Sequence, residues 1–132
     1  MDDRVTYFSV RGMEWPLCYS VGAQSEIAKR CGGIENLGIL LQEKDLTALL
    51  ANIVWVLAVL MKYGALRVNV LKRMEGSDER TPEPPVYDEL LALIDVSDAP
   101  ACQKAVMECL QAGNSTTVNT EKSSKKKAAR SS

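Results

Sequence analysis

Residues 46–73 read LTALLANIVWVLAVLMKYGALRVNVLKR and predict one long apolar helix, with Asp45 as its candidate N-cap. At 3.6 residues per turn, its apolar residues form two stripes on roughly opposite sides. A helix that is apolar all round is buried in a core, spans a membrane or binds a partner. The first stripe comprises Leu46, Leu49, Leu50, Ile53, Leu57, Leu60 and Met61, and the second comprises Ala48, Ala51, Trp55, Ala58, Val59 and Leu66.

The length of the most apolar part argues against a membrane span. Leu46 to Met61 forms about 24 Å of helix and contains Thr47 and Asn52. A span needs about 20 apolar residues. We therefore expect no membrane association. The prediction is instead a central helix whose first stripe is core and whose second stripe either is covered by the rest of the chain or serves self-association or partner binding.

A β-hairpin is predicted before this helix, over residues 6–19. Arg11-Gly12 suits a two-residue turn because glycine accepts positive φ. In the return strand Trp15 shares a side with Leu17 and Tyr19, and Pro16 suits an edge strand. A lone hairpin is marginally stable in water, so it must pack on the helices or on another chain.

Shorter helices are predicted on both sides of the long one. One covers Val21 to Cys31, between Ser20 as N-cap and Gly32-Gly33 as its end. Residues 34–41 form a loop or a helical turn that packs on the core. Two further helices cover Val86 to Ile94, with its apolar face at Tyr87, Leu90, Leu91 and Ile94, and Ala99 to Ala112, which Gly113 ends.

The remaining segments are polar. Residues 75–85 (EGSDERTPEPP) contain three prolines and predict an extended surface linker. Residues 114–132 contain almost no apolar side chains and predict a disordered basic tail. The predicted fold class is α+β, mainly α: a hairpin and four to five helices in a single domain over residues 1–113.

Composition argues against catalysis and metal binding. The chain has no histidine, so the usual general base and the commonest metal ligand are missing. The cysteines have no C-x-x-C spacing and are expected to be free thiols in a reducing cytoplasm. Acidic pairs such as Asp88-Glu89 suit solvated surface better than a carboxylate active site. We expect no enzyme, no cofactor and no metal site. The four cysteines are Cys18, Cys31, Cys102 and Cys109.

Charge is unevenly distributed along the chain. Residues 1–118 hold 11 basic and 16 acidic side chains, whereas residues 119–132 hold five basic and one acidic. An acidic body repels a phosphate backbone, so the main domain is not expected to bind nucleic acid. The basic tail lacks aromatic residues for base stacking and is interpreted as a solubilising extension.

Three short stretches in this order resemble the tail assembly chaperones of long-tailed bacteriophages and prophages, especially those of Gram-positive hosts. They are the hairpin return G-x-E-x-P-L at residues 12–17, GGIENL at residues 32–37 and LMKYGA at residues 60–65. The resemblance covers residues 4–118. It implies a non-enzymatic protein that binds the tape measure protein, keeps it soluble and helps recruit tail tube subunits. It also implies a location in the host cytoplasm and absence from the mature virion.

The residues suggest a binding surface that fits this function. Trp55, Val59 and Leu66 are predicted to form the client-binding or self-association surface, because so short a chain has little else to cover them. Tyr7 and Trp15 of the hairpin are the second candidates. Two alternatives remain open: a structural adaptor retained in an assembled particle, and a small membrane-associated protein.

Overall fold

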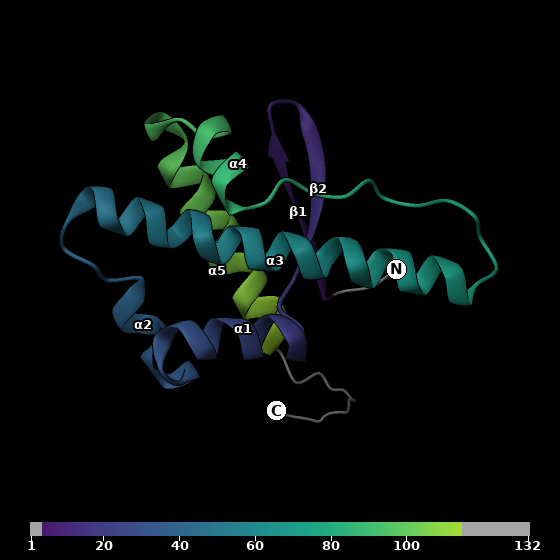
Figure 1. The fold of residues 1–132 in the computed structure, drawn as a ribbon, viewed down its shortest axis with the longest axis horizontal. Helices are drawn as coiled ribbons and strands as arrows, with labels where there is room; N and C mark the ends of the chain where they lie inside the picture. The colour runs from purple at the N-terminus through teal and green to yellow at the C-terminus, as the bar shows by residue number, and fades with distance from the viewer. Residues whose placement is uncertain (1–3, 115–132) are drawn as a thin grey trace, which may run out of the picture.

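The computed structural model describes residues 4–114 and shows a two-stranded hairpin and five α-helices arranged around the long helix α3 (Figure 1). The predicted fold class is confirmed. Asn114 is the last residue of α5, and the rest of the predicted disordered tail lies outside the described residues. The elements are β1 (Val5–Val10), β2 (Met13–Cys18), α1 (Val21–Cys31), α2 (Leu37–Leu40), α3 (Leu46–Met74), α4 (Tyr87–Leu93) and α5 (Ala99–Asn114), with 3₁₀ turns η1 (Ile34–Asn36) and η2 (Val96–Asp98).

The hairpin forms as predicted. Arg11 and Gly12 both have positive φ, at 51° and 86°, which makes the two-residue turn type I′ and matches the twist of the strands. The predicted alternation fails in the second half of β2, where Pro16, Leu17 and Cys18 are all buried. Both α3 and α5 contact this strand, so neither of its faces reaches solvent there.

Helix α1 has the predicted ends and lies antiparallel to α3. The Ser20 hydroxyl accepts a hydrogen bond from the N–H of Ala23. Gly32 ends the helix at φ 78°. Near its N-terminus α1 touches the ring of Tyr63, and near its C-terminus Arg30 lies over Trp55. The helix therefore covers α3 from Trp55 to Tyr63.

Helix α3 runs without interruption for 29 residues. Gly64 allows β2 to cross the helix, because a Cβ there would lie 2.1 Å from the carbonyl oxygen of Pro16. Asp45 precedes the helix, but its side chain makes no capping hydrogen bond.

The full length of α3 corrects the earlier argument about membranes. Over residues 46–74 the helix is long and apolar enough to span a bilayer, so its length does not exclude a membrane span. Nine residues of α3 are buried inside the protein, and the core helix of a soluble protein passes the same test of length and composition. Length and composition therefore leave both interpretations open.

The core is centred on the middle of α3. Ile53, Leu57, Leu60 and Met61 of the first stripe are buried, but Leu46 is 70% exposed. The first turn of α3 extends beyond the elements that cover its middle (Figure 1). Val54 and Val56, which belong to neither predicted stripe, are also buried, because neighbouring elements cover the helix on several sides.

The linker after α3 is irregular, as predicted, and it is anchored. The side chain of Asn69 donates to the carbonyl oxygen of Thr81 at 3.1 Å and accepts from its N–H at 2.7 Å. This pairing satisfies the backbone of an extended segment as a neighbouring strand would. The linker then passes back over the molecule to α4 (Figure 1).

Two predicted details of the C-terminal helices are wrong. Leu91, expected on the buried face of α4, is exposed, because α4 buries only the side that carries Leu90. Gly113 does not end α5, which continues to Asn114. It lies where α5 meets Tyr19, and a Cβ there would be 2.6 Å from the Tyr19 Cβ.

Candidate protein-binding surfaces

Two of the five predicted binding residues are not available at the surface. Val59 is 5% exposed and Trp15 is 6% exposed. Val59 lies on the side of α3 that α1 covers, and Trp15 lies beneath the end of the linker and α4. The expectation that so short a chain leaves these residues uncovered is wrong.

The other three residues remain accessible to different degrees. Trp55 is half-buried, and the Arg30 guanidinium lies 4.5 Å from its ring centroid. This cation–π contact caps the outer face of the indole. Leu66 is 53% exposed and Tyr7 is 56% exposed, on separate elements. The structure therefore does not join the predicted residues into one surface.

A polar contact closes the interface between α1 and α3. The Glu26 carboxylate accepts hydrogen bonds from Lys62, at 2.7 Å, and from the Tyr63 hydroxyl. The Lys62 and Tyr63 hydrogen bonds lower the pKa of Glu26, and the same carboxylate raises the pKa of both partners. The group holds two helices together at the surface, where such pairs contribute little to stability.

The first exposed apolar surface is the basic end of α3. Past the N-terminus of α1, the stripe of Trp55 and Val59 continues without cover from that helix. Leu66 and Met74 are exposed there, and Val70 is partly exposed. We define the basic end of α3 as Leu66, Val70, Arg73 and Met74, which share one side of the helix, together with Lys72, which lies across the helix from Val70.

The second surface is an acidic hollow of about 690 Å³ between β2, the end of the linker and α4. Its wall is mainly apolar, and its charged residues are both glutamates. The Glu89 carboxylate accepts from the N–H of Val86 at 2.9 Å, which caps α4. The hollow is lined by Trp15, Glu83, Pro84, Pro85, Val86, Glu89, Ala92 and Leu93.

The third surface is an uncharged groove of about 250 Å³ between α2, α3 and α5. Ile53 and Val106 form its buried floor, and Met107 is half exposed at its edge. Methionine adapts to apolar partners of varied shape. The groove is lined by Gly38, Leu41, Gln42, Ile53, Gln103, Val106 and Met107.

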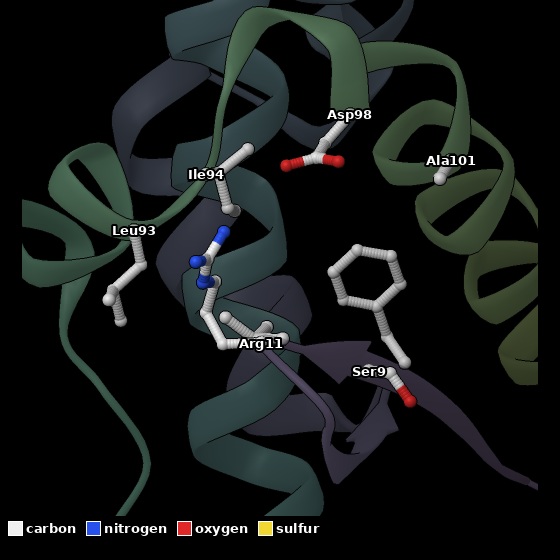
Figure 2. Close-up of a pocket in the computed structure, with 8 residues that line it drawn as sticks. Ser9, Arg11, Leu93, Ile94, Asp98 and Ala101 are labelled. Atoms are coloured by element: carbon white, nitrogen blue, oxygen red, sulfur yellow. The ribbon is translucent and has the colours of Figure 1, made fainter.

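A further hollow of about 260 Å³ lies at the hairpin tip, between Arg11 and the start of α5 (Figure 2). Its charged groups already have structural partners. Arg11 pairs with Asp95 at 3.7 Å, and the Asp98 carboxylate accepts from the N–H of Asp95. These contacts hold the hairpin tip against η2, so the hollow is explained by the fold.

The four cysteines are free thiols in the structure. Burial raises the pKa of Cys102 to about 11 and that of Cys109 to about 12. Burial also raises the pKa of Cys31, which is only partly covered. In residues 4–114 no three Cys, Asp or Glu side chains are grouped so that they could hold a metal ion.

Thiol modification should follow this order of burial. At pH 8 in native protein, we expect a disulfide reagent to modify Cys31 readily and Cys102 and Cys109 only after unfolding. The folded pKa values of the buried thiols lie above the ordinary value of 9.0, so folding favours the neutral thiol. The contribution of these two thiols to the free energy of unfolding is complete below pH 9 and is lost as pH rises through their folded pKa values of about 11 and 12. The free energy of unfolding should therefore fall over that range.

The control is Cys31→Ala, which should remove only a small part of the alkaline decline, because Cys31 is partly covered and the large upward shifts in pKa belong to Cys102 and Cys109. Equal reaction rates at all cysteines in native protein would contradict the burial of α5 against the hairpin.

Comparisons with protein-family models, with curated proteins and with solved structures give no match. The surfaces must therefore be interpreted from their own chemistry. Sequence reasoning missed the groove entirely, because its lining comes from three separate helices. It also missed the anchoring role of Asn69, for which an uncharged polar side chain in a largely apolar helix was the only signal.

Proposed function

We propose that this chain is a non-enzymatic tail assembly chaperone of a long-tailed bacteriophage or prophage. Its client would be the tape measure protein, which it keeps soluble in the host cytoplasm while tail tube subunits are recruited. The proposal rests on the three stretches that resemble this family and on the presence of an apolar groove suited to a helical client.

The uncharged groove is the observation that carries the proposal. A helical client presents apolar side chains at i, i+3, i+4 and i+7, which a groove between helices accommodates. Among residues 4–114 no charged side chain lines the groove, so an apolar client side chain displaces no tightly hydrated group there. Gln42 and Gln103 supply polar contacts at its margin.

The three resembling stretches explain the fold rather than the client site. The hairpin return and LMKYGA meet where Pro16 crosses Gly64. GGIENL turns the chain after α1, and Asn36 in it donates to the carbonyl oxygen of Cys31 at 3.0 Å. None of these stretches lines the groove, so the resemblance and the groove support the proposal independently.

The test is co-expression with a tape measure protein, which the proposal expects to be encoded by the gene beside that of this chain. We expect wild-type protein to keep that neighbour soluble and to be absent from purified particles. Met107→Asp places a charge at the half-exposed edge of the groove and should weaken binding about tenfold or more, as loss of an apolar anchor does. Pull-down and the soluble fraction of the client measure both effects.

Leu91→Asp is the matched control, because Leu91 is similarly exposed on α4 and lies outside the groove. Circular dichroism should show native helix content for both variants. If the neighbour's solubility is indifferent to wild-type protein, the chaperone proposal is wrong. Recovery of the chain in purified particles would support the adaptor alternative, and detergent-dependent extraction would support the membrane alternative.

A further inference from the structure

The charges of this protein are separated between α3 and the rest of the fold. Helix α3 contains four basic residues and no acidic residue, and all four lie between Lys62 and Arg73. The rest of residues 4–114 contains seven basic and fourteen acidic residues. The C-terminal half of α3 is therefore a basic, apolar rod attached to an acidic body.

The apolar residues at the basic end of α3 lack cover because α1 is too short to reach them. Gly22, at the start of α1, lies against Tyr63, and Leu66 is nearly one helical turn further on. Leu66 and Met74 keep 53% and 74% of their surface exposed. Lys62 is neutralised by Glu26, but within the described part of the chain Lys72 and Arg73 form no ion pair.

The acidic hollow has the complementary chemistry. Val86 and Leu93 give it exposed apolar side chains, and Glu83 and Glu89 give it negative charge. Asp88 adds an exposed acid beside it, and from residue 81 to residue 103 the chain contains no basic residue. The hollow therefore suits an apolar stripe that carries a cation, as the stripe of Leu66, Val70 and Met74 carries Arg73.

The two surfaces cannot meet within one molecule. The uncovered stripe of α3 continues the side on which α1 packs, whereas the linker and α4 lie on the other side of α3 (Figure 1). A second copy brings them together.

We propose that the basic end of α3 of one copy docks in the acidic hollow of the next, so that the protein self-associates head to tail. The two surfaces differ, so the contact is heterologous and repeats from copy to copy. Pairing of two α3 ends is disfavoured, because it would bring Lys72 and Arg73 of both copies together. This inference goes beyond the proposed function and does not depend on it.

The test uses sedimentation velocity of the full chain over a wide concentration range. We expect species larger than a dimer at high concentration and low salt, and dissociation at high salt as the charges are screened. Two charge-reversal variants separate the surfaces: Lys72→Glu with Arg73→Glu alters the α3 end, and Glu83→Lys with Asp88→Lys alters the hollow. Each variant alone should associate at least about tenfold more weakly than wild type. An equal mixture of the two variants should regain association.

The mixture is decisive because each variant keeps one native surface. If the hollow variant alone still associates as wild type, the contact is between two α3 ends and the proposal is wrong. The proposal is also wrong if wild type stays monomeric throughout. A third variant tests whether the basic tail, rather than the end of α3, occupies the acidic hollow. It carries Lys125→Glu, Lys126→Glu and Lys127→Glu. Loss of association in that variant, with the α3-end variant unaffected, would overturn the proposal.

Discussion

Gly64→Ala is expected to lower the free energy of unfolding by about 2–3 kcal/mol, although alanine is the better helix former. The added Cβ would lie 2.1 Å from the carbonyl oxygen of Pro16 and 2.7 Å from the Cα of Leu17. Both atoms belong to the backbone of β2, which cannot rotate away as a side chain can. Relief of the contact requires the hairpin to move off α3, with loss of buried apolar surface on both elements. Urea unfolding followed by helical circular dichroism measures the change.

Gly38→Ala is the matched control for this prediction. Gly38 also lies in a helix, but no atom is within 4 Å of the Cβ it would gain. We expect this variant to be as stable as wild type or more stable by up to about 1 kcal/mol, through helix propensity alone. If both variants behave alike, β2 does not cross α3 at Gly64.

Leu57→Ala is expected to lower the free energy of unfolding by about 2–5 kcal/mol, the range for large-to-small changes in a close-packed core. Leu57 is fully buried in the middle of α3, where the hairpin, α4 and α5 leave little room for the cavity to collapse. The same urea titration gives the value, and tryptophan fluorescence reports the core separately through Trp15 and Trp55.

Leu46→Ala should change stability by no more than about 0.5 kcal/mol, as for most surface positions. Leu46 belongs to the same predicted stripe as Leu57 but lies in the exposed first turn of the helix. Equal losses in the two variants would mean that another copy or element covers the first turn of α3.

The two proposals assign different surfaces to different partners. The uncharged groove suits an apolar client helix, whereas each charged surface has its complement on a second copy of this chain. Met107→Asp should therefore impair client binding and leave self-association intact. Charge reversal at Lys72 and Arg73 should do the opposite, so the failure of one proposal leaves the other testable.

Local sequence signals determined the elements of this protein. The ends of α1 follow from Ser20 and Gly32, and the hairpin turn follows from Arg11-Gly12, because caps and tight turns depend on a few neighbouring residues. Apolar periodicity likewise placed α3 within a residue of its observed end. The absence of acidic residues from α3 is also visible in the sequence.

Only the tertiary structure decided which apolar residues are exposed. Val59 and Leu66 share a stripe in the sequence, yet one is buried and the other is open, because α1 covers α3 only as far as Tyr63. Trp15 shares the apolar side of its strand with Leu17 and Tyr19 and was a candidate for the binding surface, yet the linker and α4 cover it. Helical period specifies a direction around an axis, but burial depends on where distant segments of the chain lie along that axis. The groove between α2, α3 and α5 arises in the same way, from residues far apart in the sequence.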